Sequence, residues 1–333
     1  MMDSYKLFKS LNNDRKKIFN LIQKNGAMTK NEILNRTGMK LTTLNRIMNP
    51  IEKDGIIVQK CIGESTGGRR PILYDVNVCG FYIIGIDISK MYVQVSIVNL
   101  RMEIFYKKIS SIDISNSVDY LIDRIQNIIN NAYVELRLDM LKLIGIGVAI
   151  ETGLWSNVSV KKMLEKRLNC NIIIENGANS AAIAEHLYGS GRQFNNLAYF
   201  DCGPRIREGT ILHGQIVRSV NDSEYVFENM LSLKKESMNL KRIFIDIQKN
   251  ETLSKSIILN FANVFAKSIK LYADLLDLKC VILNGPLANL DLFYKICVDY
   301  INREIVLKRG GYFKENAISI GTAALVIESC IKN

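Results

Sequence analysis

The stretch TKNEILNRTGMKLTTLNRIMNPI, residues 29–51, decides the fold of the amino-terminal part of the chain. Thr29 and Glu32 have the spacing of a capping box, in which each side chain satisfies a free backbone amide of the other residue. This box predicts a helix that ends at Thr37, where Gly38 permits a tight turn. A further helix is predicted from about Lys40. Two short helices joined by a glycine-containing turn are typical of the helix-turn-helix motif, whose second helix can enter a DNA major groove.

The second helix of this motif has two chemically different faces. The apolar residues that we expect on its inner face are Leu41, Leu44, Met48 and Ile51. The opposite face carries Thr42, Thr43, Asn45, Arg46 and Asn49. An amide can pair with adenine, an arginine can pair with guanine, and short hydroxyls suit either base. We therefore expect Thr42, Thr43, Asn45 and Arg46 to contact DNA. Pro50 should end or kink the helix near Met48, because a proline inside a helix removes a hydrogen bond.

The segments on either side of the motif extend the prediction. Apolar residues at helical spacing after Asp14 predict a preceding helix of about a dozen residues. Two β-type runs, Ile56–Ile62 and Pro71–Val76, flank a polar loop that contains Arg69 and Arg70. This pattern predicts a β-hairpin wing, with both arginines placed to reach phosphates or a minor groove.

The distribution of charge agrees with a nucleic-acid partner. Residues 1–80 hold 14 Lys and Arg against 7 Asp and Glu, whereas the rest of the chain holds 30 against 26. A basic segment of this kind favours an acidic polymer as partner. Two other interpretations remain open at this point, a merely lysine-rich solvated surface and a three-helix packing domain with no role in DNA binding.

Several classes of protein are not expected. The seven cysteines are scattered, with no CxxC spacing, and only two histidines are present, which argues against a metal site or a histidine-based catalytic triad. The longest apolar runs fall far short of the roughly 18 residues that span a bilayer, and the amino terminus lacks an apolar signal stretch. We expect a soluble, cytoplasmic protein with no membrane partner.

Three quoted segments together resemble the ROK family, specifically its transcriptional regulators. They are ILNRTGMKLTTLNRIMNPIEKDGII (33–57), GESTGGRRPILYDVN (63–77) and FYIIGIDIS (81–89). The resemblance implies an α/β protein in which an N-terminal winged helix-turn-helix precedes a two-lobed, ribonuclease-H-like body of the actin, Hsp70 and sugar-kinase superfamily. The domains that we expect are 1–77 for DNA binding and 78–333 for the ROK-like body, with lobes at 78–185 and 186–320 and a C-terminal helix at 321–333.

Apolar runs place the main elements of this body. The expected strands are Phe81–Ile88, Tyr92–Asn99, Met102–Ser110, 143–150, Leu197–Cys202, Gly209–Leu212 and Cys280–Leu283. The expected helices are an amphipathic one from Val118, a long one over Ile257–Leu276 and a closing one after Gly321.

The phosphate-binding loops of ROK kinases are altered in this chain. The family's first loop resembles Asp-x-Gly-Gly-Thr, and here the corresponding residues 87–91 read DISKM, with the aspartate but no glycine. The glycine-rich second loop contains Pro204, Arg205 and Arg207, so an amide donor is lost and bulk is added where a triphosphate would pass. We expect no ATP binding. The glycines of 284–286 and 321–324 are interpreted as turn and helix-packing positions.

The catalytic and sugar-binding motifs of the kinases are also incomplete. The family's Glu-Asn-Asp-Ala-Asn supplies a general base, and this chain reads Glu-Asn-Gly-Ala-Asn at 175–179, with Gly177 at the base position and no neighbouring carboxylate expected to replace it. The Glu-x-Gly-His motif aligns with 226–229, VFEN, and no cysteine follows it to complete a zinc site. Asn176 and Asp87 remain as candidate effector contacts.

The sequence therefore predicts a DNA-binding transcription regulator, with repression the expected mode, and not an enzyme. Its partners would be an inverted-repeat operator in double-stranded DNA, further copies of the chain in a dimer or tetramer, and a small-molecule effector, sugar or other. No catalytic residue, cofactor or metal is expected. The alternatives are an ATP-dependent sugar kinase with an appended DNA-binding module, and a scaffold whose body has lost ligand binding.

Overall fold

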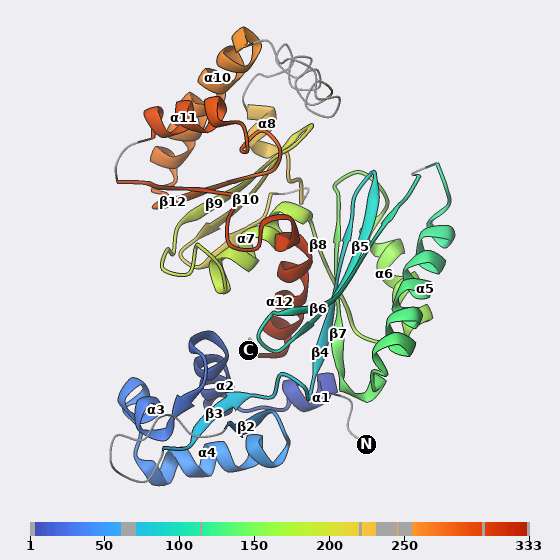
Figure 1. The fold of residues 1–333 in the computed structure, drawn as a ribbon, viewed down its shortest axis with the longest axis vertical. Helices are drawn as coiled ribbons and strands as arrows, with labels where there is room; N and C mark the ends of the chain where they lie inside the picture. The colour runs from blue at the N-terminus through green and yellow to red at the C-terminus, as the bar shows by residue number, and fades with distance from the viewer. Residues whose placement is uncertain are drawn as a thin grey trace.

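The residues that the structure describes form three β-sheets, one in the amino-terminal domain and two in the body (Figure 1). The structure is a computed structural model that describes residues 4–60, 71–113, 115–219, 222–230, 245, 255–301 and 304–331. Among these residues no helix is long and apolar enough to cross a membrane.

The amino-terminal domain is a winged helix. Its helices are α1 (Ser4–Lys9), α2 (Asn13–Asn25), α3 (Lys30–Thr37) and α4 (Leu41–Lys53). Its antiparallel sheet has the order β1-β3-β2, formed by β1 (Met28–Thr29), β2 (Ile57–Lys60) and β3 (Leu73–Val76). The predicted capping box at Thr29 and Glu32 is present, and Gly38 adopts the left-handed conformation at φ 67°. Both features confirm the predicted helix-turn-helix.

Two expectations for α4 need correction. The helix does not end near Met48 but continues past Pro50 to Lys53, because Ile51 is fully buried and its packing favours a further helical turn. Leu41 is 51% exposed at the start of the helix, and Ile47 instead joins Leu44 and Met48 in the core.

The first lobe is built on a five-stranded sheet with the order β6-β5-β4-β7-β8. Its strands are β4 (Tyr82–Ile88), β5 (Tyr92–Asn99), β6 (Ile104–Ser111), β7 (Leu143–Ile150) and β8 (Ile172–Glu175). The first three are antiparallel, and β4, β7 and β8 are parallel. Helices α5 (Val118–Leu136) and α6 (Asn157–Leu168) pack on its outer face, and a short 3-10 helix, η1 (Met140–Lys142), precedes β7 (Figure 1).

The second lobe repeats this topology with the order β11-β10-β9-β12-β13. Its strands are β9 (Leu197–Cys202), β10 (Ile206–Leu212), β11 (Gln215–Val217), β12 (Cys280–Asn284) and β13 (Val306–Arg309). The outer helices are α8 (Val226–Met230), α10 (Lys255–Leu275) and α11 (Asp291–Tyr300), and a 3-10 helix, η2 (Lys314–Asn316), follows β13.

Helices α7 (Gly177–Leu187) and α12 (Ala317–Ile331) lie between the two sheets (Figure 1). Glycines make this approach possible. A Cβ on Gly321 would lie 1.7 Å from the Ser180 backbone oxygen, and one on Gly85 would lie 2.0 Å from that of Ser319. Gly321 is thus a packing position, as expected, and α12 begins four residues earlier than predicted.

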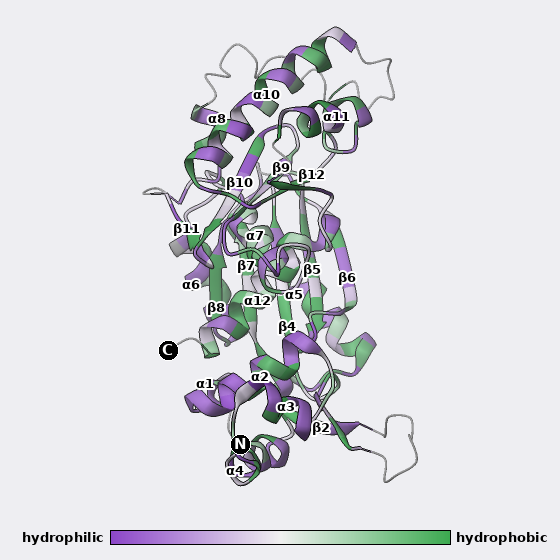
Figure 2. Ribbon diagram, turned by 90° about the vertical axis from the view of Figure 1, so that its left-hand side faces the viewer, coloured by the Kyte–Doolittle hydropathy of each residue, from purple (hydrophilic) through white to green (hydrophobic). Residues whose placement is uncertain are grey.

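The winged helix shares a continuous apolar core with the body. The Phe8 ring of α1 contacts Phe19 in α2 and Phe81 at the start of the first lobe, with centroid distances of 5.5 and 5.1 Å. Figure 2 shows apolar residues concentrated in the central strands β4, β5 and β7. Helix α1 was not expected, and its buried aromatic residue joins the winged helix to the body.

Candidate functional site

The outer face of α4 presents polar side chains without apolar cover. Thr42, Arg46 and Asn49 are exposed, whereas Thr43 and Asn45 are half-buried. Within the described part of the chain, Arg46 makes no hydrogen bond or ion pair, so its guanidinium can bond a base edge at no cost in internal contacts.

Asn45 is held by a residue that the sequence interpretation missed. The Lys30 ammonium donates a 2.7 Å hydrogen bond to Asn45 Oδ1 and lies 5.1 Å from the centroid of the Tyr74 ring. The bond orients the Asn45 amide and leaves its NH₂ group available as a donor. The capping box, which places Lys30 at the first position of α3, was the available signal for this contact.

The amino terminus of α4 is open. Its N-cap residue is Lys40, an exposed side chain that makes no capping hydrogen bond. The first amides of a helix without a cap carry partial positive charge, and with a lysine beside them they form a favourable site for a phosphate.

The wing strands β2 and β3 pair in antiparallel fashion, from Ile57 opposite Val76 to Lys60 opposite Leu73. The pairing agrees with the predicted hairpin. Arg69 and Arg70, the expected wing contacts, lie outside the described residues.

In the body, four carboxylates lie around one arginine. Arg207 on β10 is paired in register with Asp201 on β9, and its Nε lies 3.0 Å from Asp201 Oδ2. Its Nη1 lies 3.8 Å from Glu224 Oε2, and its charge opposes the rise that burial imposes on the pKa of Asp87 and of Glu151. These residues, which both lobes supply, form the Arg207 cluster.

Burial dominates the ionisation of Asp87. It raises the pKa of this carboxyl to about 6, with Asp201 and Glu224 adding to the effect and Arg207 opposing it. The Tyr92 hydroxyl donates a 2.9 Å hydrogen bond to Asp87 Oδ2. Only 2% of Asp87 is exposed, so the expected effector contact is covered in this conformation.

The backbone amides of the first loop are used inside the protein. The Lys90 amide donates to Glu151 Oε2 at 3.0 Å, and the amides of Met91 and Tyr92 both donate to Ser89 Oγ at 3.2 Å. A phosphate loop needs such amides free. Here serine and glutamate oxygens take the place of an anion.

The second loop is closed in the same way. The Arg205 guanidinium lies 3.6 Å from the centroid of the Tyr225 ring, and its Nε donates to Glu228 Oε1 at 2.8 Å. The Ile206 amide donates to the other oxygen of the same carboxylate. Glu228, which lies in the segment that we aligned with the sugar-binding motif of the kinases, therefore holds this loop.

The position of the kinase base is occupied by other groups. A Cβ on Gly177 would lie 3.1 Å from Arg207 Nη1 and 3.4 Å from Glu224 Oε2. The sequence analysis did not anticipate Glu224 here, because the chain folds residue 224 back onto the amino terminus of α7. Fully buried Glu224 accepts hydrogen bonds from the amides of Thr152 and Ala178, at 3.0 and 3.1 Å.

Asn176, the second candidate effector contact, is the N-cap of α7. Its Oδ1 accepts from the Asn179 amide at 2.8 Å and its Nδ2 donates to the Asp222 carbonyl at 3.2 Å, so both ends of the side chain are engaged. Among the described residues no group of three or more His, Cys, Asp and Glu side chains has the arrangement of a metal site.

The fold and these sites define a winged-helix DNA-binding domain in front of a two-lobed, kinase-like body. Residues 12–58 match the winged helix-turn-helix DNA-binding family, and residues 83–221 match the ROK family. The ROK match covers about two fifths of the chain, and the body shares its fold with solved structures of ROK proteins.

Known proteins of two kinds resemble this chain. The xylose repressors of Bacillus spizizenii and Caldicellulosiruptor bescii are 25% and 24% identical to it over 222 and 231 residues, or 62% and 65% of this chain. The chain spans 57% of the length of each of these relatives. A ROK family transcriptional regulator, a homolog of the E. coli MLC protein, has the same fold at a TM-score of 0.71 and 12% identity, covering 98% of this chain and 97% of its own. A ROK hexokinase from Thermus thermophilus gives 0.59 at 15% identity, covering 75% and 100%.

Proposed function

We propose that the protein is a DNA-binding transcription regulator that represses its target genes from an inverted-repeat operator. The observation that carries this proposal is the exposed face of α4, where Arg46 has no described partner and Asn45 is oriented by Lys30. The names of the xylose repressors to which the chain is similar support repression as the mode. Binding to chromosomal DNA would place the protein in the cytoplasm.

The test is the affinity of Arg46→Ala for an operator selected from genomic DNA by the wild-type protein. Loss of one base-edge contact should cost about 1–3 kcal/mol and relax preference at one position of each half-site. Lys267→Ala, which removes an exposed cation from α10, is the matched control and should bind normally. Unchanged affinity of Arg46→Ala would refute the assignment of this face.

We also propose that the body does not transfer phosphate. Three observations support this: the Arg207 cluster, the hydrogen-bonded amides of the first loop and the missing side chain at position 177. ADP release with common hexoses and pentoses should stay at background, and Gly177→Asp should not restore it, because a new carboxylate would enter a site that already holds Glu224. Sugar-dependent turnover that disappears in Asp87→Ala would overturn this view.

The remaining assignments are also proposals. Domain limits of 1–77 and 78–333, with lobes of 78–185 and 186–320, fit a regulator whose body oligomerises and senses an effector. Arg69 and Arg70 are the proposed wing contacts with phosphates or the minor groove. Asp87 and Asn176 are only 2% and 5% exposed, so an effector could reach them only after the lobes separate.

A further inference from the structure

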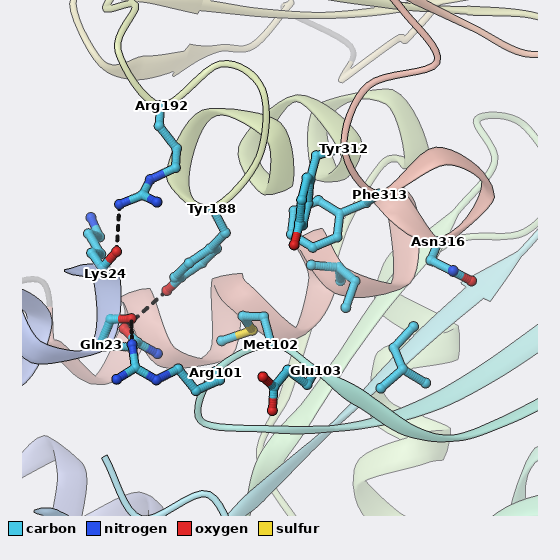
Figure 3. A pocket seen from close by; sticks show the side chains of 12 residues that line it. Gln23, Lys24, Arg101, Met102, Glu103, Tyr188, Arg192, Tyr312, Phe313 and Asn316 are labelled. Carbon is cyan, nitrogen blue, oxygen red and sulfur yellow. Dashed lines mark hydrogen bonds between the residues drawn. The ribbon is translucent and has the colours of Figure 1, made fainter. Parts of the chain in front are cut away.

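A pocket lies where the winged helix meets both lobes of the body (Figure 3). It has a volume of about 490 Å³, which falls in the range of small-molecule sites. Its walls come from the end of α2, the turn between β5 and β6, the segment after α7, and the residues that lead into α12. It is separate from the Arg207 cluster and shares no residue with it.

Two arginines build the frame of this pocket, one from each lobe. Arg101 donates to the carbonyls of Ile22 and Gln23 at 2.9 and 2.6 Å, and it also pairs with Asp75. Arg192 donates to the Lys24 carbonyl at 2.5 Å. Both cations thus bind the carboxyl end of α2, where the helix dipole is negative.

The pocket also has positively charged groups that are available to a ligand. Lys24, Arg101 and Arg192 face a single carboxylate, Glu103, which accepts a 2.8 Å hydrogen bond from Asn99. In the described part of the chain the Lys24 ammonium has no hydrogen bond or ion pair, and Arg192 uses one of its donors. Figure 3 shows Lys24 and Arg192 together on one side of the pocket.

The other side of the pocket is aromatic. Tyr312 and Phe313 meet edge to face, with 4.9 Å between ring centroids, and Tyr312 is 68% exposed (Figure 3). The Tyr188 hydroxyl closes the floor by donating to Gln23 Oε1 at 3.2 Å. An anionic group at Lys24 and Arg192 with a flat or apolar portion against Tyr312 would satisfy both sides.

We infer that this pocket binds a small organic anion with a flat or apolar portion, and that the ligand joins the winged helix to the body. A phosphate ester and a carboxylate share this chemistry. The site differs from the kinase-type cleft, because α2 of the DNA-binding domain supplies part of its wall. Occupancy would therefore fix the orientation of that domain relative to both lobes.

Isothermal calorimetry on the full chain tests the inference without DNA. The probes are phenyl phosphate, benzoate, inorganic phosphate and phenol, which separate the phosphate, carboxylate, bare-anion and uncharged cases. We expect one site per chain for phenyl phosphate or benzoate, and none for phenol. Absence of binding by both organic anions would overturn the inference, and equal affinity for inorganic phosphate would overturn the role of the aromatic wall.

Two variants localise the binding. Lys24→Met should weaken it at least tenfold without loss of folding, since its ammonium has no described partner, and Arg192→Gln should do the same. Lys267→Met on α10 is the matched control and should bind as the wild type does. Unchanged affinity in Lys24→Met would place the anion elsewhere. A change in operator affinity with ligand is a separate measurement that rests on the proposed function, so its failure would leave the calorimetric result intact.

Discussion

At the scale of single residues, the burial of charged groups decides the protonation of the Arg207 cluster. Arg207 is the one cation in contact with Asp201 and Glu224 among the described residues, and both of these carboxylates act on Asp87 as well. A lone guanidinium offsets only part of this negative charge, so the buried carboxyl of Asp87 retains its proton to higher pH.

The stability of the protein should depend on pH through Asp87. Its pKa rises from 3.8 to about 6 on folding, so the folded state holds this proton more tightly, and stability falls as pH increases from about 4 to 6. Asp87→Asn removes the cost and should raise the free energy of unfolding at pH 7 by up to about 3 kcal/mol, since one pKa unit corresponds to about 1.4 kcal/mol.

Urea denaturation of both proteins at pH 7 and pH 4 measures this effect. The advantage of Asp87→Asn should shrink at pH 4, where the wild-type carboxyl is protonated when folded. An equal difference at both pH values would show that the asparagine acts through packing and not through charge.

At the scale of elements, the two helices of the motif are capped in opposite ways. Helix α3 has a complete capping box, with the Thr29 amide 2.7 Å from Glu32 Oε2. Helix α4 begins at Lys40 with no side-chain cap. Helix α4, which would face the proposed operator, lacks the stabilisation that a side-chain cap provides. This fits a helix end whose free amides bind a phosphate.

Lys40→Ser should therefore change stability and DNA affinity in opposite directions. A serine N-cap should stabilise the domain by about 0.5–1 kcal/mol, as caps do in other helices. Removal of the cation should weaken operator binding and lower the salt dependence by about one ion. Thermal melts and anisotropy titrations at several salt concentrations give both quantities, and parallel changes in the two would argue against a phosphate contact here.

At the scale of the whole molecule, the winged helix is fixed to the body by several kinds of contact. Phe8 joins their apolar cores, Gln23 donates to the Leu100 carbonyl at 2.8 Å, and Arg101 and Arg192 bind the end of α2. A domain held in this way can transmit the arrangement of the body to α4. If the body forms a symmetric dimer, two recognition helices are presented with a defined spacing.

The operator should then be an inverted repeat with half-sites one or two helical turns apart. Selection from genomic fragments should enrich such a sequence, and insertion of five base pairs between the half-sites should abolish tight binding, because it turns one half-site to the opposite face of the duplex. Insertion of about ten base pairs is the matched control for distance. Enrichment of a single half-site would contradict two-fold binding.

What the sequence determined by itself was local. The capping box at Thr29, the turn at Gly38 and the apolar runs of β5 and β9 are set by residues close together in the chain, so caps and apolar runs predicted these elements correctly. The differences from the kinase motifs at Gly177 and in both phosphate loops could also be identified in the sequence, as functional groups that are missing.

Only the tertiary structure decided what replaced those groups. Glu224 reaches Gly177 across 47 positions, and Arg192 reaches α2 from 168 positions away, distances over which no periodic pattern carries information. The exposure of Leu41 and the burial of Ile47 were decided by the same kind of contact. The side of α4 that is buried depends on where α2 and the wing strands pack. Long-range packing desolvates Asp87 and Arg207 and so fixes the chemistry of the Arg207 cluster. It also creates the pocket at α2.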